Sequence, residues 1–388
     1  MTPRRVLGFF LMILAVVQSK ITSDRSRWWP NGRIFYRIHF GVDAELVHDA
    51  IRSIEEQTCI RFVENDFGAG QHHIDIVAGD DCFSDIGYKH PNGDAAENFL
   101  SQIQLLSLGP KCATRGTALH EIGHALGLSH EHNRLDRDYF VQIAPRNVRP
   151  GRIGEFYRKA ELEWFEVPYD VGSIMHYSAR TFAREGANAM LPVDANFHQT
   201  MGQRGDMSFY DAKVLNSAYC LGKCENKPTL NCQNSGYANP NDCSRCLCPK
   251  GFTGRLCEAV DSGEFCPPFE VTAKDEWRSL SFHSAGNCSW LVRTEAPNHR
   301  VEFRIKYLKM KVYPHGICDD DYVEVKYKDD FGLSGARFCY YGPGLRYLDG
   351  STISDTDRIL VRYQGDGGSF EIEHRQTRVD EEESFAWL

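Results

Sequence analysis

The sequence lacks an excess of positive charge and, beyond its first 19 residues, it lacks long apolar runs. Its 388 residues carry 44 Lys and Arg against 53 Asp and Glu, which gives a formal net charge of −9. Nucleic-acid binding requires a basic surface, so this balance argues against a nucleic-acid partner. No apolar stretch after residue 19 reaches the length of a membrane-spanning helix, and we therefore expect no membrane span.

The first 19 residues have the layout of a secretory signal peptide. Arg4 and Arg5 supply positive charge, residues 6–17 form an almost unbroken apolar run, and Gln18 and Ser19 end it. The run is too short for a confident membrane span, although an uncleaved membrane anchor is the alternative. We therefore expect a secreted, extracellular protein.

The 14 cysteines are unevenly distributed, and none lies between residues 113 and 219. An even number of cysteines in a secreted chain predicts disulfides. Six of the cysteines fall between residues 224 and 257, where about 40 residues are too few to bury much apolar core. This dense group predicts a small module that is held together by disulfides.

A chain of 388 residues is too long for one ordinary core, so we expect two or three domains. Residues 20–220 mix helical and strand patterns and predict an α+β domain. Residues 266–375 contain strand-like runs between turn residues, the pattern of an antiparallel β-sandwich. Residues 376–388 include acidic residues at 380–383 and predict a solvated tail. The predicted helices are residues 44–57 and 113–127, and the predicted strands are 33–40, 59–63, 73–78, 301–308, 322–328, 359–363 and 369–374.

The strongest chemical signal is the run His-Glu-Ile-Gly-His-Ala-Leu-Gly-Leu-Ser-His, which starts at His120. His120 and His124 are four residues apart, which places both imidazoles on one face of a helix. The glycine between them and His130 permits the left-handed backbone that ends a helix, so His130 can reach the same metal from a loop. Three neutral imidazoles hold zinc and leave a position open for water. Glu121 lies beside the metal and is the predicted general base and acid for peptide hydrolysis.

The long form of this motif is the metzincin pattern, and the residues after it resemble one metzincin family, the astacins. Residues 130–138 read His-Glu-His-Asn-Arg-Leu-Asp-Arg-Asp, similar to the astacin continuation H-E-H-x-R-x-D-R-D. Residues 173–177 read Ser-Ile-Met-His-Tyr, like the astacin methionine turn. The resemblance covers about residues 25–220, is of the kind found in nematode astacins, and implies a two-lobed catalytic domain that holds one zinc ion and hydrolyses peptide bonds.

The resemblance implies roles for further residues. Met175 would lie in a β-turn under the zinc, and Tyr177 would bind the resting zinc and then donate a hydrogen bond to the substrate oxyanion. A packed core aromatic is the alternative for Tyr177, and we assign no ligand role to His176. Residues 80–88 and 108–112 resemble the edge-strand region on which an extended substrate pairs. The implied disulfides of this domain are Cys59–Cys220 and Cys82–Cys112.

Two accessory modules are also implied by resemblance: residues 221–258 resemble an EGF-like module, and residues 266–375 resemble a CUB domain. Such modules bind protein substrates or matrix, so extracellular or dietary proteins and matrix contacts are the expected partners. A calcium site is not expected, because a lysine at or near Lys309 stands where calcium-binding CUB domains have a glutamate. Asn287 begins a glycosylation sequon. The implied disulfides are Cys224–Cys243, Cys232–Cys246, Cys248–Cys257, Cys266–Cys288 and Cys318–Cys339.

The N-terminal segment departs from the astacin pattern, because almost nothing lies between the signal and the catalytic domain. Many astacins carry a pro-segment whose aspartate occupies the zinc site, and residues 40–43 match that pattern only faintly. Trp29 matches the tryptophan near the family's mature start, which puts the mature N-terminus close to Lys20, with its amino end turned toward Glu131. We hypothesise that signal cleavage itself produces the active form, and a misassigned gene start is the alternative.

These observations predict a secreted zinc endopeptidase. A catalytically silent, matrix-binding protein is the runner-up, but silent relatives lose Glu121 or a ligand, and this chain keeps all of them. The tripeptide Arg204-Gly-Asp206 allows a third hypothesis, adhesion through integrins. Against it, the astacins have Gly-Gln-Arg at this place before their last helix, and residues 205–206 can start that helix.

Overall fold

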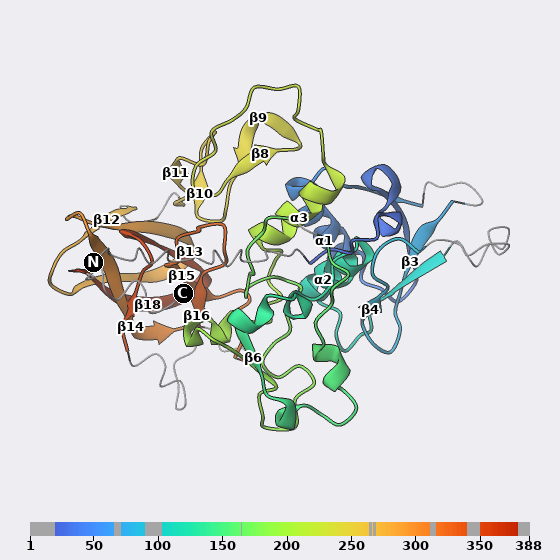
Figure 1. Cartoon of the computed structure of the whole chain (residues 1–388), viewed down its shortest axis with the longest axis horizontal. Coiled ribbons are helices and arrows are strands. Elements are labelled where there is room, and N and C mark those ends of the chain that lie inside the picture. Colours follow the sequence, from blue (N-terminus) through green and yellow to red (C-terminus); the bar gives the residue numbers. More distant parts are fainter. Residues whose placement is uncertain are drawn as a thin grey trace, which may run out of the picture.

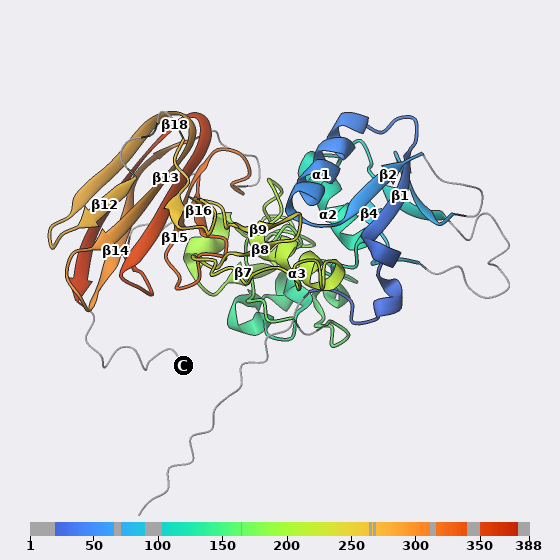
Figure 2. The same cartoon turned by 90° about the horizontal axis from the view of Figure 1, so that it is seen from above.

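The computed structural model describes residues 20–65, 71–89, 103–163, 165–263, 266, 269–310, 316–339 and 350–378. The predicted signal peptide and residues 379–388 lie outside these ranges. The described chain forms three units, which we call the N-terminal domain (residues 20–220), the cysteine-rich module (residues 221–263) and the β-domain (residues 269–378). In both views the green part of the N-terminal domain lies between its blue part and the orange-to-red β-domain (Figure 1 and Figure 2). No helix in this part of the chain is long and apolar enough to cross a membrane.

The upper lobe of the N-terminal domain (residues 33–125) is a mixed sheet with two helices. The strand order is β2-β1-β3-β5-β4, and only the edge strand β4 runs antiparallel to its neighbour. Asp43 caps α1 by accepting hydrogen bonds from the backbone amides of Glu45 and Leu46, and the apolar face of α1 is buried. The structure thereby confirms the helix expected at 44–57. The elements are β1 (Arg33–Ile38), α1 (Ala44–Gln57), β2 (Arg61–Glu64), β3 (His73–Val77), β4 (Phe83–Ser84), β5 (Ile103–Ser107) and α2 (Arg115–Ala125).

The lower lobe (residues 126–220) has little regular structure until its last helix, α3 (Phe209–Tyr219). Ser208 and Asp211 cap each other's backbone amides in a capping box. The expectation that residues 205–206 start this helix is therefore wrong, because Ser208 supplies the cap that satisfies the first free amides. The remaining elements of the domain are η1 (Arg25–Arg27), η2 (Pro30–Gly32), η5 (Glu131–Asn133), η6 (Arg137–Tyr139), β6 (Val141–Ile143), η7 (Pro145–Asn147), η8 (Ile153–Phe156), β7 (Met190–Pro192) and η9 (Ala195–Gln199).

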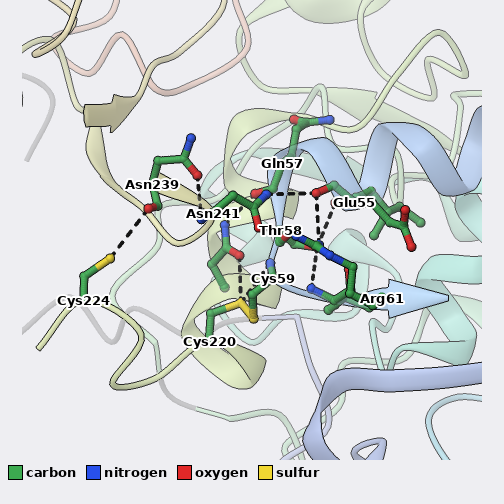
Figure 3. The surroundings of a disulfide bond; sticks show 12 residues. Glu55, Gln57, Thr58, Cys59, Arg61, Cys220, Cys224, Asn239 and Asn241 are labelled. Atoms are coloured by element: carbon green, nitrogen blue, oxygen red, sulfur yellow. Dashed lines mark hydrogen bonds between the residues drawn. A yellow bond between two sulfur atoms is a disulfide. The ribbon is translucent and has the colours of Figure 1, made fainter. Parts of the chain in front are cut away.

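The cysteine-rich module follows directly after a disulfide that joins the end of α3 to the segment after α1. Figure 3 shows this Cys59–Cys220 bond, which spans 161 residues of sequence. Beside it Asn241 of the module donates to the backbone oxygen of Glu55 at 2.9 Å and accepts from Arg61 at 2.6 Å. The module is thereby fixed beside α1 and β2. Its strands are β8 (Tyr237–Asn239), β9 (Asp242–Leu247), β10 (Phe252–Thr253) and β11 (Ala259–Val260).

All 14 cysteines are paired, and the pairs are those that the family resemblance implies. They are Cys59–Cys220, Cys82–Cys112, Cys224–Cys243, Cys232–Cys246, Cys248–Cys257, Cys266–Cys288 and Cys318–Cys339.

The β-domain is built around two long strands, β13 (Arg278–Thr294) and β18 (Arg358–Arg378), that pair along most of their length. The strands expected at 359–363 and 369–374 are confirmed, but their separation is wrong, because both belong to β18. The glycine-rich residues 364–368 between them stay within this strand, where its register with β13 shifts between His283 and Ala285. β18 also continues through Arg378, so residues 376–378 belong to the sheet and not to the tail.

Most pairs of the β-domain are antiparallel, as expected, but β12 runs parallel to β13. The other strands of the domain are β12 (Glu270–Ala273), β14 (His299–Lys309), β15 (Tyr322–Lys326), β16 (Ala336–Phe338) and β17 (Thr352–Ile353).

Candidate metal centre and active site

Three histidines from a helix and the loop after it meet at one point. Helix α2 carries His120 and His124 one turn apart and ends before Gly127, whose φ of 99° is in the left-handed region. The chain then turns back, which brings His130 to the same place. One nitrogen of each ring lies within 4.8 Å of the others, and the Nε2 atoms of His124 and His130 are 3.1 Å apart. The structure therefore brings together the three predicted ligands.

The protein fixes which ring nitrogens face this point. The Nδ1 of His120 donates to the backbone oxygen of Ile174 at 2.8 Å, and the Nδ1 of His124 donates to that of Leu128 at 2.7 Å. The proton of each ring is thus on Nδ1, and each Nε2 keeps a lone pair. Burial lowers the pKa of His124 to about 4 and lowers those of His120 and His130 well below their usual value. Neutral imidazoles that converge in this way fit a zinc ion.

Glu121 follows the first histidine and is almost buried, with 6% of its surface exposed. Burial raises the pKa of this carboxyl to about 7, against the opposing effects of Arg204 and of the Ser84 backbone N–H, which donates to it. Among the residues that the structure describes, none gives a hydrogen bond to its second oxygen, Oε2. Ser84 belongs to β4, the edge strand inside the predicted substrate-binding region 80–88. The carboxyl therefore contacts this strand, and its pKa near neutral allows it to exchange a proton.

Residues 173–177 form a turn below the histidines. Met175 is fully buried, and a Cβ added at Gly123 of α2 would lie 2.9 Å from its sulfur, so a larger residue at position 123 would require the methionine side chain to shift. His176 accepts from the Tyr169 hydroxyl at 2.7 Å and donates to the backbone oxygen of Tyr177 at 2.7 Å. Both nitrogens of His176 are used within the protein, in agreement with its not being assigned as a ligand.

Tyr177 packs against His130, the third predicted ligand. Its ring centre is 4.3 Å from that of His130 and 4.1 Å from that of His132, and 7% of its surface is exposed. Burial raises the pKa of Tyr177 above its usual value, so its phenol stays protonated at neutral pH. A protonated phenol beside the metal centre can donate a hydrogen bond to a developing oxyanion.

Five buried ionic side chains lie beneath the metal centre, and the sequence did not point to them as a group. We call them the buried charge cluster: Lys20, Glu131, Arg134, Asp170 and Asp211, each no more than 1% exposed. The Lys20 Nζ lies 3.0 Å from Glu131 Oε2, also pairs with Asp211, and donates to Ser173 of the turn at 3.0 Å. The cluster thus joins the residue after His130, the turn that holds Met175, and α3.

The carboxylates around Lys20 keep its buried ammonium group charged. Burial alone would lower the pKa of Lys20, but Asp211 and Glu131 outweigh it, so the net pKa is raised. From the sequence, Lys20 is expected only to mark the mature N-terminus, with its amino end near Glu131. In the structure it is the Lys20 side chain that reaches Glu131, and no spacing rule in the sequence signals that contact.

The charged side chains of the tripeptide at residues 204–206 have hydrogen-bond and ion-pair partners within the protein. Arg204 donates to backbone oxygens of Ile174 and His176 at 2.9 and 3.1 Å. Asp206 pairs with Arg115 at 3.3 Å and with Lys250 of the cysteine-rich module at 2.7 Å. Since both charged side chains are engaged in this way, the structure argues against their use for adhesion.

Asn287 lies on β13 with its side chain exposed, next to the buried Cys288. Glycosylation there remains a prediction.

Comparison with known proteins places these observations in a family. A family model described as Astacin (Peptidase family M12A) matches residues 21–220. Zinc metalloproteinase nas-34 of Caenorhabditis elegans is 34% identical over 346 residues, which cover 87% of this chain and 54% of the relative. Zinc metalloproteinase dpy-31 of Haemonchus contortus is 34% identical over 375 residues, which cover 92% of this chain and 65% of the relative. The chain thus spans less than two thirds of the length of these relatives.

Among solved structures, high choriolytic enzyme 1, a hatching enzyme zinc-protease of Oryzias latipes, is 31% identical. The match covers 50% of this chain and 96% of that chain, with a TM-score of 0.43.

Proposed function

Because the chain belongs to the astacin family, peptidase family M12A, we propose that it is a secreted zinc metalloendopeptidase. The observation that carries this proposal is the convergence of three neutral imidazoles beside one buried carboxyl. His120, His124 and His130 would hold one zinc ion, with Glu121 next to it. Buried ionisable groups whose pKa values are displaced in this way are typical of catalytic sites.

A bound zinc ion would supply Lewis acidity, polarising the scissile carbonyl and making a water molecule more acidic. Glu121 would take the proton of the attacking water and pass it to the leaving nitrogen, acting first as base and then as acid. A carboxyl with a pKa of about 7 suits both steps, because it exchanges a proton readily near neutral pH. The Ser84 N–H that donates to it would hold the carboxyl in place.

Tyr177 is proposed to stabilise the oxyanion that forms during attack. Its raised pKa keeps the phenol proton available for donation, and its ring is held against His130 and His132. The edge strand β4 next to Glu121 is the proposed site where an extended substrate pairs by β-addition. Met175 would support the site from below.

The other two units are proposed to act in binding. We assign residues 221–258 to an EGF-like module and residues 266–375 to a CUB domain, with contacts to extracellular protein or matrix. Fourteen paired cysteines support an oxidising, extracellular location. Extracellular or dietary proteins are the proposed substrates.

The test compares the wild-type protein with Glu121→Gln and with Glu56→Gln, a control glutamate exposed on α1. We expect wild type and both variants to bind zinc, and Glu121→Gln to lose about 10²- to 10⁴-fold in cleavage of a denatured protein. Full cleavage by Glu121→Gln would contradict its role as base. A wild-type protein that cleaves nothing would instead favour a silent, matrix-binding protein.

A further inference from the structure

The β-domain is joined to the lower lobe by a dense interface. The backbone amide of Cys318 donates to the backbone oxygen of Gln199 at 2.9 Å, and that of Cys339 donates to the Gln199 side chain at 2.9 Å. The Arg337 amide donates to the Thr200 hydroxyl at 2.7 Å. Buried apolar side chains of the two units also form one continuous cluster. The two units therefore meet as parts of one body rather than as loosely tethered modules.

One segment of this interface, residues 203–206, lies between the β-domain and the first turn of the helix that carries two metal ligands. The Arg204 amide donates to Asp319 Oδ1 of the β-domain at 2.6 Å. A Cβ on Gly205 would lie 2.5 Å from the backbone oxygen of Asp319. On the other side, a Cβ on Gly116 of α2 would lie 1.6 Å from the backbone oxygen of Arg204. Only glycines allow these approaches, so the segment has no room to shift toward either neighbour.

The Arg204 side chain extends from this segment to the floor of the metal centre, by which we mean the turn at residues 173–177 and the buried charge cluster. Its Nη1 donates to the backbone oxygens of Ile174 at 2.9 Å and His176 at 3.1 Å. The same Ile174 oxygen accepts the Nδ1 proton of His120. A single carbonyl is thus held by Arg204 and in turn holds the first predicted zinc ligand.

We propose that Asp319 of the β-domain is a positioning residue for the metal centre, acting through Arg204 and the Ile174 carbonyl on His120. This inference rests on the proposed zinc-dependent function. The partners of metal-bound histidines fix the ring orientation and the basicity of the ligand. Through this chain of contacts the β-domain is part of the working enzyme in addition to any binding role.

Individual hydrogen bonds matter at this junction because it is not filled by apolar side chains. A cavity of about 580 Å³ remains there, lined by residues that include Arg115, Arg204, Lys250, Asp319 and Arg337. Without the Asp319 carboxylate, the Arg204 amide would have lost its acceptor and would face this cavity. Residues 203–206 would then be less firmly held on the side of the β-domain. The guanidinium would then hold Ile174 less firmly, and the ring of His120 would be less well oriented.

The experiment uses the full chain loaded with zinc and compares wild type, Asp319→Ala, Asp319→Asn and Asp320→Ala. Asp319→Ala removes the acceptor for the Arg204 amide, whereas Asp319→Asn keeps an oxygen there. Asp320→Ala is the matched control, since it removes the exposed carboxylate next in sequence. Two quantities are measured: the rate at which zinc passes to a chelator, and kcat and KM for a peptide too short to reach the β-domain.

We expect Asp319→Ala to release zinc about 10- to 100-fold faster and to lose kcat by a similar factor, with KM little changed. Asp319→Asn should restore most of both, and Asp320→Ala should match wild type. A merely structural role would lower the melting temperature without this selective rescue of zinc retention.

The proposal would be overturned if folded Asp319→Ala released zinc at the same rate as the wild type and had the same kcat. If that variant does not fold, Asp319→Ser is used, because its side chain is polar but too short to accept from the Arg204 amide. Normal zinc retention in Asp319→Ser would also overturn the proposal. A wild-type protein that holds no zinc would overturn the proposed function itself. Zinc-loaded, active wild type with an indistinguishable Asp319 variant would overturn only the role of the β-domain.

Discussion

The floor of the metal centre and the interior of the β-domain are both buried, but the first is formed largely by charged side chains and the second by apolar ones. The floor contains the buried charge cluster, in which Lys20 faces Glu131 and Asp211. The interior of the β-domain is apolar and aromatic. Its fully enclosed side chains include Trp290, Val292, Val301, Phe303, Ile359, Val361, Phe370 and Ile372.

This difference shows where the fold specifies geometry and where it only supplies stability. Apolar packing tolerates substitutions that conserve volume, because dispersion and the hydrophobic effect have no direction. Buried charges are costly unless each is paired and hydrogen-bonded, so they permit few arrangements. The charge cluster lies where the loop of His130, the Met175 turn and α3 must keep one relative position. The β-domain also buries ionic groups, but Glu324 and Arg362 lie on the side that faces the other units.

The largest effect should come from removing one charge of the cluster. Lys20→Met leaves two buried carboxylates, Glu131 and Asp211, without their shared cation. We expect the free energy of unfolding to fall by about 3–5 kcal/mol, with loss of bound zinc as the loop after His130 shifts. Chemical denaturation and metal analysis of the purified protein measure both quantities.

The matched control is Lys274→Met. This lysine also pairs with a glutamate, Glu295, but at the surface of the β-domain, with side-chain exposures of 30% and 57%. Exposed pairs contribute less than about 1 kcal/mol. Equal destabilisation by the two lysine variants would show that the buried ion pairs of the floor contribute no more to the free energy of unfolding than an exposed pair does.

The regular elements of the chain could be predicted because their signal is local. Helix α1 has apolar residues at helical spacing and a capping aspartate, and it lies where the sequence placed it. The strands of the β-domain were found but wrongly divided at residues 364–368, because glycines that usually mark a turn here mark a bend within β18. Local composition cannot distinguish the two, since the difference depends on whether β13 continues alongside.

The metal centre could be predicted to the extent that its residues are close in sequence. His120, His124 and His130 share one motif, and the structure brings them together. Lys20 and Arg204 were not found, because Lys20 meets Glu131 and Arg204 meets Ile174 only after distant segments have packed. A cation partnered by distant carboxylates or carbonyls has no periodicity, and the Arg-Gly-Asp letters pointed toward a different role.

A smaller effect should appear on acidification, and it should come from the β-domain. Burial raises the pKa of Glu324, but Arg362, Lys326 and Arg337 outweigh it and lower that pKa to about 2. A depressed carboxyl pKa stabilises the fold above the unfolded value and loses that contribution as pH falls through the folded value. We expect about 3 kcal/mol of the free energy of unfolding to be lost between about pH 4.5 and about pH 2.

Denaturant unfolding over this pH range, compared between wild type and Glu324→Gln, isolates this contribution. The variant should show a shallower fall in stability on acidification, because it has no proton to take up at that site. Glu276→Gln, which alters an exposed carboxylate of the same domain, should keep the wild-type slope. An unchanged slope in Glu324→Gln would mean that other carboxylates cause the acid loss.

The smallest effect should separate the two interiors most clearly. Ile372→Val removes one methyl group from the centre of β18, at a side chain with no exposed surface, and should cost about 0.5–1.5 kcal/mol with activity unchanged. Ser173→Ala removes one oxygen from the floor, where that hydroxyl donates to Asp211 at 2.7 Å and accepts from Lys20. It should cost about 1–3 kcal/mol and also lower kcat, because Ser173 begins the turn under the histidines. If Ile372→Val reduced kcat as much as Ser173→Ala, directional contacts would not be what holds the metal centre, and packing alone would account for both regions.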